Sequence, residues 1–336
     1  MTDADPLADG NLTTAEGVGS ADRAGKADGP PFPMADPVLG QIGGTPLVPH
    51  PADDVLCKME RQSPTLSHKD RLAVGMLLAL KDRGELADGQ RVVEASSGNM
   101  AGGVALACNR LGHPCTIVSP ETASPIKMGF VRALGAELIQ VPAVPHDDED
   151  YYQKQAARRA DDADALYLNQ YERALNREVH AAWTGPELWA QIEDREVSHV
   201  VAATGSGGTI SGIGAYLSTQ DDSIRIVGVD AEHSNVSRDF YGQEREEYET
   251  EIEGLGQYRT TEAIEFDAID EMVSVADDDA VARAKSEAAD HGLLLGLSSG
   301  AVLEVARSIT AEDDDARVVA VVHDGAEQYF HQVEGW

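Results

Sequence analysis

Basic residues are scarce in this chain of 336 amino acids: 26 Lys and Arg stand against 59 Asp and Glu, which gives a formal net charge of -33. A field of that sign repels nucleic acid and anionic lipid, so neither is expected as a partner. The carboxylates are spread along the whole chain, and concentrated salt would screen most of their mutual repulsion. We interpret this composition as halophilic. The acidic runs at 147–150, 277–279 and 312–315 are expected to be solvated faces.

Cysteine is rare as well. Cys57, Cys108 and Cys115 form no CxxC pair, and their odd number argues against a disulfide framework, which favours a cytoplasmic location. No stretch approaches the roughly 20 apolar residues of a membrane helix. The acidic start MTDADPLADG lacks the features of a signal peptide. The 10 histidines show no metal-binding spacing such as HExxH, so no metal is expected.

Large apolar residues are almost missing from residues 1–36, which are rich in Gly, Ala, Asp and Pro. Such a segment buries too little surface to offset its ordering entropy, so we predict a disordered acidic tail. Beyond it, apolar runs rich in Val and Ile alternate with amphipathic stretches. The runs predict buried strands at 91–95, 115–119, 137–141, 199–203, 225–229 and 317–322.

Three amphipathic stretches predict helices, from Ser67 to Gly84, over 99–111 and over 125–134. Alternation of strands and helices at this spacing predicts a parallel, right-handed βαβ architecture. In such sheets, ligands bind at the loops that follow the strands.

The first unusual loop, SPTLSHKDR at 63–71, leads into the first of these helices. A lysine in the first turn of a helix faces the positive end of the macrodipole, which makes its ammonium easier to deprotonate. An imine-forming lysine needs that property, so Lys69 is a candidate. A solvated lysine flanked by Asp70 and Arg71 is the alternative.

The second loop, EASSGNMAG at 94–102, joins a predicted strand to a helix. Ser96, Ser97 and Asn99 either cap that helix or grip an anionic group such as a carboxylate. The third loop, TGSGGTISG at 204–212, has glycines that let the backbone approach a phosphate. It matches neither the dinucleotide fingerprint nor GxxxxGK[ST], which suits a small phosphorylated cofactor.

The order of these loops resembles that of cysteine synthases and cystathionine β-synthases, which use pyridoxal phosphate (PLP). The likeness runs from about residue 39 to about residue 330. Further matching segments are IGGTPL at 42–47, SPIKMGFVRALGAE at 124–137, NQYER at 169–173, His180 with TGPELW at 184–189, EGLG at 253–256, GLSSGA at 296–301, and Asp324-Gly325 with Tyr329.

The resemblance implies an α/β fold of the tryptophan-synthase-β type (fold type II), with two three-layer α/β domains and the cofactor between them. Residues 41–62 and 174–336 would form the larger, PLP-binding domain. Residues 63–173 would form the smaller, mobile domain on the substrate side. A homodimer is implied by the resemblance alone.

The resemblance also implies site residues. Lys69 would hold PLP as a Schiff base and move the α-proton, Asn99 would contact the ring hydroxyl, and Ser298 would face the pyridine nitrogen. The phosphate would lie in a cradle of Gly205, Ser206, Gly207, Gly208 and Thr209. The substrate carboxylate would be held by Ser96, Ser97 and Gln170, with Met100 beside it.

The expected reaction follows from Ser298. A neutral hydroxyl leaves the ring less electron-withdrawing than an acidic partner would, which suits β-elimination and β-replacement. The implied reaction replaces the β-substituent of an amino-acid substrate, O-acetylserine or O-phosphoserine, by sulfide to give L-cysteine. Serine or threonine dehydration, a cystathionine β-synthase-like reaction with another nucleophile, and a catalytically silent binding protein stay open.

The chain departs from the resembled family at three places. Met100 replaces a usual Thr, Leu66 replaces a usual Gly, and Gln257-Tyr258-Arg259 replaces Ala-Gly-Phe. We expect all three departures on the substrate side of the site, so PLP binding should be intact while substrate choice differs.

Overall fold

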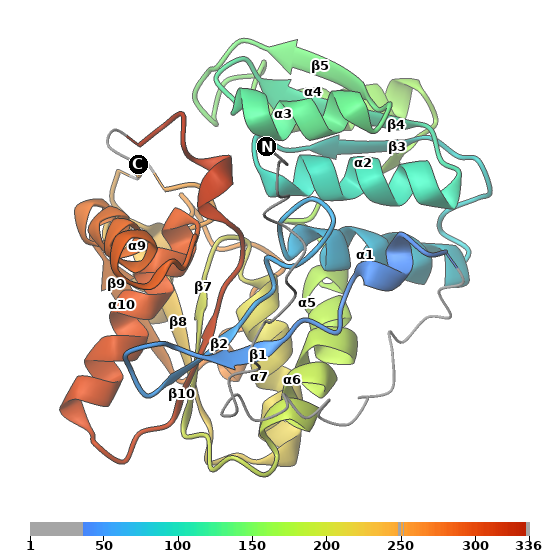
Figure 1. Ribbon diagram of the computed structural model, residues 1–336. Helices are drawn as coiled ribbons and strands as arrows, with labels where there is room; N and C mark the ends of the chain where they lie inside the picture. The colour runs from blue at the N-terminus through green and yellow to red at the C-terminus, as the bar shows by residue number, and fades with distance from the viewer. Residues whose placement is uncertain (1–35, 248–249, 251, 334–336) are drawn as a thin grey trace, which may run out of the picture.

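The structure is a computed structural model that describes residues 36–247, 250 and 252–333. Two sheets of unequal size organise it (Figure 1). The predicted tail at 1–36 lies outside the described residues except for Asp36. That carboxylate accepts hydrogen bonds from the backbone N–H groups of Val38 and Leu39 and pairs with Arg110. Asp36 therefore belongs to the folded part of the chain.

The smaller sheet is parallel throughout, with strand order β5-β4-β3-β6. Its elements are β3 (Val92–Ala95), α2 (Asn99–Leu111), β4 (Cys115–Pro120), α3 (Pro125–Ala133), β5 (Glu137–Val141), α4 (Tyr152–Asp162) and β6 (Leu166–Tyr167). Because side chains alternate along a strand, Val92 and Ile117 pack towards α2 and α3, whereas Val93 and Val118 pack on α4. Helices thus cover both faces, as the continuous apolar runs predict.

The larger sheet has the order β1-β2-β10-β7-β8-β9. Its strands are β1 (Leu47–Pro49), β2 (Val55–Lys58), β7 (His199–Ala203), β8 (Arg225–Ala231), β9 (Glu271–Val275) and β10 (Val318–Val321). All neighbours are parallel except β1, which runs antiparallel to β2. The expectation of a purely parallel architecture is therefore wrong at this edge, where a short turn at 50–54 connects the two strands.

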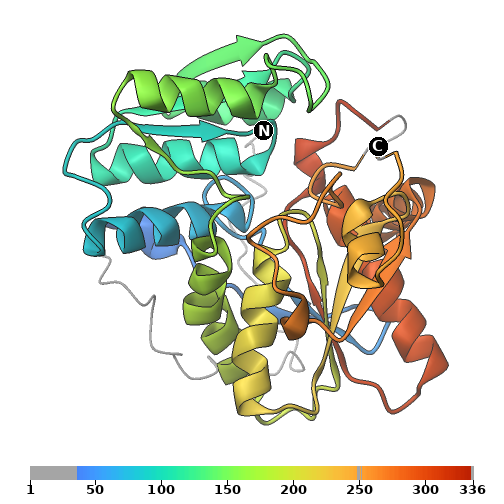
Figure 2. The same ribbon diagram turned by 180° about the vertical axis from the view of Figure 1, so that it is seen from behind.

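Helices also sandwich the larger sheet (Figures 1 and 2). They are α5 (Leu175–Val179), the π-helical turn His180–Thr184, α6 (Gly185–Ile192), α7 (Gly208–Gln220), α8 (Asn235–Phe240), α9 (Asp277–His291) and α10 (Leu297–Glu312). Val201 and Val318 pack on α9 and α10, whereas Val200 and Val319 pack on α6 and α7. Short 3-10 turns lie at Leu39–Gln41, Phe266–Ala268 and Ala326–Gln328.

Helix α1 (Lys69–Asp82) lies between the two layered units, beneath α2 and above α5 in Figure 1. Its close approach to α5 depends on Gly75, because a Cβ there would lie 2.4 Å from Val179 Cγ1. One apolar cluster joins α1 and α2 to Val179 and Trp183 of the larger unit. The first residue of α1, Lys69, is thereby fixed between the two sheets.

The predicted strands and helices all occur, with ends shifted by at most a few residues. Each sheet lies within one of the predicted domains, while the domain boundaries themselves stay a prediction. Across the described ranges, no helix is long and apolar enough to cross a membrane.

Candidate active site

The lysine loop places Lys69 at the start of α1, half-buried and bordering a cavity of about 350 Å³. The loop is held by Asp70, whose carboxylate accepts hydrogen bonds from the backbone N–H of Thr65 at 2.7 Å and from its hydroxyl. Burial lowers the pKa of Lys69 to about 8, although the carboxylates of Glu94 and Asp324 act in the opposite direction. A reactive neutral amine is therefore accessible near neutral pH.

The second loop opens the N-terminus of α2 towards the same cavity. Gly98, which has no side chain to offer, occupies the N-cap position, and no described side chain caps this helix. Ser96 Oγ instead accepts the N–H of Gly98 at 3.1 Å. The capping alternative is thus wrong. The first N–H groups of α2 are left for an anionic ligand.

The third loop requires its glycines. Gly207 adopts φ +81, and a Cβ there would lie 2.5 Å from Ile264, whereas a Cβ on Gly205 would lie 2.7 Å from the carbonyl oxygen of Gly254. The backbone therefore curls tightly into the start of α7. Thr209 Oγ1 is placed by His180 Nε2 at 3.2 Å. N–H groups and hydroxyls in this arrangement form a phosphate cradle.

Among the described residues, five helices begin at the cavity: Lys69 opens α1, Asn99 opens α2, Tyr152 opens α4, and Thr209 and Ser298 lie in the first turns of α7 and α10. The positive ends of several helix dipoles thereby lie near one volume, which favours an anionic ligand. The other predicted site residues that border the cavity are Gly205, Ser206, Gly207, Ser96, Ser97, Met100 and Gln170.

Gly208 is the exception among the predicted residues. It does not border the cavity, because Asn176 fills the space beside it and its Oδ1 would lie 2.0 Å from an added Cβ. Asn176 also donates from Nδ2 to Ser206 Oγ at 3.0 Å and to the carbonyl oxygen of Gln170 at 2.9 Å. This buried amide links the phosphate loop to the predicted carboxylate site.

Sequence reasoning missed two buried carboxylates that act on Lys69, of which Asp324 borders the cavity. Asp324 accepts from Asn99 Nδ2 at 2.6 Å and from the Tyr329 hydroxyl at 2.5 Å, and burial raises its pKa. Glu94 accepts from the backbone N–H of Asn169 at 2.7 Å, and burial raises its pKa to about 8. The segments containing both residues belonged to the family likeness, but no spacing indicated that they would meet Lys69.

Sequence reasoning also missed the role of three buried histidines close to Lys69. The rings of His68 and His323 lie 4.7 Å apart, and His180 lies 6.3 Å from His68. Burial holds the pKa of each below its ordinary value, so all three are neutral near pH 7. Because these imidazoles are neutral, they do not contribute to the lowered pKa of Lys69, which burial causes.

The substrate-side departures do not share one environment. Met100 borders the cavity, but its side chain is only 1% exposed and belongs to the apolar cluster around α1 and α2. Tyr258 borders the cavity together with Tyr151 and Tyr152. Leu66 does not border it, so its expected place on the substrate side is wrong. Its backbone takes φ +65, a conformation that a glycine would adopt without strain.

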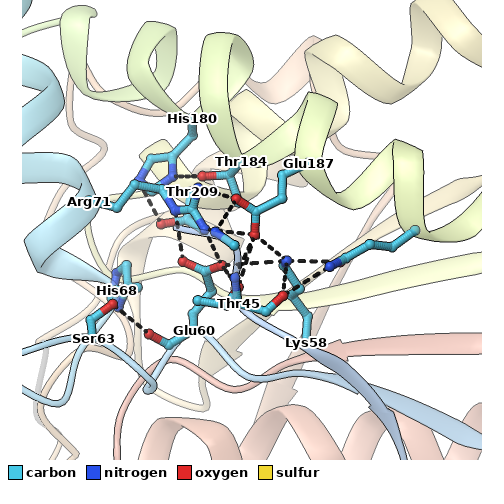
Figure 3. Close-up of polar contacts among 12 residues, drawn as sticks. Thr45, Lys58, Glu60, Ser63, His68, Arg71, His180, Thr184, Glu187 and Thr209 are labelled. Carbon is cyan, nitrogen blue, oxygen red and sulfur yellow. Dashed lines mark hydrogen bonds and ion pairs between the residues drawn. The ribbon is translucent and has the colours of Figure 1, made fainter. Parts of the chain in front are cut away.

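A buried ionic network fixes the first turn of α1 (Figure 3). Arg71 pairs with Glu60 on the chain just after β2 at 2.8 Å and with Glu187 of α6 at 2.8 Å. Lys58 of β2 reaches the same Glu187 at 2.5 Å. Burial alone would raise the pKa of Glu187, but Arg71 and Lys58 hold it below the usual range. The network anchors Lys69, two residues before Arg71, to the larger sheet.

One potential metal-binding cluster lies away from the cavity, where ligand atoms of His50, Glu287 and His291 come within 4.8 Å of one another. The Nδ1 atom of His50 lies within hydrogen-bond distance of the backbone N–H groups of Ala52 and Asp53 and 3.0 Å from the Asp53 carboxylate. Its Nε2 atom lies 2.7 Å from Glu287. We interpret the cluster as a hydrogen-bonded support between β1 and α9.

Comparison with known proteins agrees with this site. The family described as "Pyridoxal-phosphate dependent enzyme" matches residues 38–324. A cysteine synthase of Staphylococcus aureus (strain N315) is 32% identical over 301 residues, which cover 88% of this chain and 95% of the relative. A cystathionine beta-synthase of Apis mellifera is 32% identical over 303 residues, 87% of this chain and 60% of that protein.

Among solved structures, the crystal structure of an O-ureido-L-serine synthase is similar, with a TM-score of 0.82 and 26% sequence identity. The match covers 90% of this chain and 98% of that one. The fold and site thus define a PLP-dependent enzyme of fold type II. The chain belongs to the pyridoxal-phosphate dependent enzyme family, which confirms the predicted fold class and cofactor. Its cysteine synthase relatives support β-replacement as the general reaction type.

The residues present fit PLP. Asn99 Oδ1 is buried and has no hydrogen-bond partner among the described residues, so the amide has unused capacity at the cavity. The glycine loop offers a cradle in which a Cβ on Gly205 or Gly207 would collide with neighbouring chain. The half-buried amine of Lys69 borders the same cavity as Ser298. The glycine loop would hold the phosphate of PLP, Asn99 and Ser298 would contact its ring, and Lys69 would react with its aldehyde.

Proposed function

We propose that the enzyme replaces the β-substituent of an O-activated L-serine by sulfide to give L-cysteine. The observation that carries the proposal is the set of side chains around one cavity. The amine of Lys69, the neutral hydroxyl of Ser298, the glycine loop and the open N-terminus of α2 all border it. Relatives named cysteine synthase support the same reaction.

In this proposal Lys69, Asn99, Ser298 and residues 205–209 hold PLP. When bound, PLP stabilises negative charge at the substrate Cα. The Lys69 amine takes the proton from that carbon, and its lowered pKa of about 8 leaves a fraction unprotonated near neutral pH. Ser298 offers a hydroxyl to the ring nitrogen rather than a charge, which favours departure of the β-substituent.

The substrate carboxylate is proposed to lie at the N-terminus of α2. Uncapped N–H groups and the hydroxyls of Ser96 and Ser97 are available there, and the Gln170 side chain faces the same cavity. The helix dipole favours the negative charge. The β-carbon is proposed to face the part of the cavity bordered by Tyr151, Tyr152 and Tyr258.

We propose an uncharged activating group, with O-acetylserine favoured over O-phosphoserine. Among the described residues that border the cavity, Lys69 is the single cationic side chain, and it is committed to the cofactor. Glu253 borders the cavity with a carboxylate that would repel a phosphate dianion. Lys127 is close, but it pairs with that same Glu253 at 2.6 Å.

The organisation of the protein is proposed along with its reaction. Residues 41–62 and 174–336 would form the larger domain, and residues 63–173 would form the mobile one, which agrees with the distribution of strands between the two sheets. We also propose that the enzyme is a homodimer, as is typical of the family. Its acidic composition suits the cytoplasm of a salt-loving cell.

The proposal is tested with the purified protein loaded with PLP. O-acetylserine, O-phosphoserine and serine are each supplied with sulfide, and cysteine is measured. We expect the highest kcat/KM with O-acetylserine and no turnover in Lys69→Ala. A protein that binds PLP but forms only pyruvate would instead be a dehydratase. A protein that forms cystathionine from homocysteine, but no cysteine from sulfide, would instead catalyse the cystathionine β-synthase-like reaction.

A further inference from the structure

The departure at 257–259 is firmly attached to the larger unit. Ser234 Oγ accepts the N–H of Gln257 at 3.1 Å, and the N–H of Asn235 donates to the Gln257 carbonyl oxygen at 3.0 Å. Asn235 Nδ2 also donates to the Tyr258 carbonyl oxygen at 3.0 Å. Both anchoring residues lie at the start of α8, so hydrogen bonds attach the backbone of this segment to the larger unit.

The side chains of this segment, in contrast, reach the smaller unit. The ring of Tyr258 stacks on His146, which lies between β5 and α4, at a centroid distance of 4.2 Å. Arg259 forms an ion pair with Glu172, which follows β6. Arg259 Nε donates to the Tyr258 hydroxyl at 3.0 Å, which joins the two contacts. We call these four residues the cleft bracket.

Tyr258 of the cleft bracket borders the cavity from the larger unit, and Tyr151 and Tyr152 border it from the smaller unit. His146, which stacks on Tyr258, is exposed to solvent, so the Tyr258 ring lies between the cavity and solvent. The activated serine itself enters this cavity as a zwitterion, so selection between nucleophiles acts on the space that remains once that substrate is bound. Sulfide needs little of that space, whereas a second amino acid also brings a charged ammonium and carboxylate that must be desolvated.

We propose that Tyr258 and Arg259 determine nucleophile specificity: with the activated serine bound, the cleft bracket keeps the remaining space narrow, so that sulfide is admitted and an amino-acid thiol is excluded. This inference rests on the proposed β-replacement function and assigns its selectivity to named residues. It also explains why the family-like Ala-Gly-Phe is absent. A glycine at position 258 would supply no ring for His146, and a phenylalanine at 259 would supply no charge for Glu172.

The test compares holoenzymes of the wild type, Tyr258→Ala, Tyr258→Phe and Arg259→Gln. In each, kcat/KM is measured for sulfide and for L-homocysteine with the same activated serine. We expect the homocysteine-to-sulfide ratio to rise about tenfold in Tyr258→Ala, which loses an aromatic pair. A rise of about threefold is expected in Arg259→Gln, which loses a partly exposed ion pair. Tyr258→Phe keeps the ring on His146 and should lie between wild type and Tyr258→Ala.

Hydrogen exchange supplies a second readout that does not depend on turnover. Amides of residues 145–152 should exchange faster in Tyr258→Ala and Arg259→Gln. The matched control is Arg225→Gln, which removes an exposed ion pair to Glu271 within the larger sheet. That control should change neither the exchange of 145–152 nor the ratio.

An unchanged ratio in both Tyr258→Ala and Arg259→Gln would overturn the inference, even if exchange increased. A change of equal size in the Arg225→Gln control would overturn it as well. If no nucleophile were used by PLP-loaded wild type, the proposed function itself would fail. Unchanged exchange in the variants would then separately show that the cleft bracket does not hold the two units together.

Discussion

The two sides of the cavity are built in different ways. On the cofactor side, the short loops around Lys69, Asn99 and Thr209 each lead directly into a helix, and their geometry depends on neighbours in sequence such as Gly98 and Gly207. On the substrate side, the wall comes from segments far apart in the chain. The motifs of the cofactor cradle are thus recognisable locally in the sequence, whereas the substrate-side wall is formed by residues that meet only when the two units come together.

The largest expected effect is a loss of stability when the buried ion pairs that anchor the first turn of α1 are broken. Arg71→Met leaves Glu60 and Glu187 buried with one cation fewer, which should lower the free energy of unfolding by about 3–5 kcal/mol. The matched control is Arg83→Met, because Arg83 pairs with Glu178 at an exposed site and should cost only about 0–1 kcal/mol. Urea denaturation measures both. Equal losses in the two variants would show that the buried network does not anchor α1.

Met100 tests the boundary between the two sides. Met100→Thr restores a hydroxyl near the proposed carboxylate site, and one hydrogen bond to a charged group corresponds to about tenfold or more in affinity. Because O-acetylserine, O-phosphoserine and serine share the same α-carboxylate, we expect kcat/KM to rise for all three by a similar factor. Because the Met side chain is almost fully buried, the smaller Thr should also lower stability by about 1–3 kcal/mol. Unchanged kcat/KM values together with lower stability would make Met100 a packing residue only.

The pH dependence of PLP uptake by the apoprotein tests whether the pKa of Lys69 is lowered. The amine attacks only when it is unprotonated, and burial lowers its pKa to about 8. The rate at which the apoprotein takes up PLP should therefore rise by about tenfold per pH unit below that value and level off above it. Stopped-flow absorbance measures the rate. A rise that continues to the pKa of an ordinary lysine, about 10.4, would contradict the effect of burial.

Salt should have the smallest effect, and it acts on both sides alike. With 59 acidic and 26 basic residues, repulsion between carboxylates exceeds the attraction within exposed ion pairs. Screening over about 3 Å at molar salt should therefore raise the melting temperature. Thermal melts across a salt series measure it. A melting temperature that is flat or falls with added salt would refute the halophilic interpretation.

Much of the cofactor side could be predicted from sequence, because continuous Val-rich runs and N-terminal helix signals are local. The helix at 99–111 has the predicted ends, and the glycine loop lies where the pattern placed it. The antiparallel β1 was missed because three residues carry too little periodicity. The meeting of Tyr258 with His146 was missed because contacts across 112 residues of chain leave no local pattern. Leu66 was misplaced because comparison with the resembled family shows that a residue is unusual, but not where its side chain lies.

Lys69 is proposed to carry the cofactor in the cavity between the two units. Borohydride reduction of the PLP-loaded protein, followed by peptide mapping, tests this assignment. We expect a pyridoxyl group on the peptide that contains Lys69. Lys58 and Lys127 are the alternative lysines near this site, but they are buried in ion pairs with Glu187 and Glu253. A pyridoxyl group on either of those lysines, with Lys69 unmodified, would show that Lys69 does not carry the cofactor.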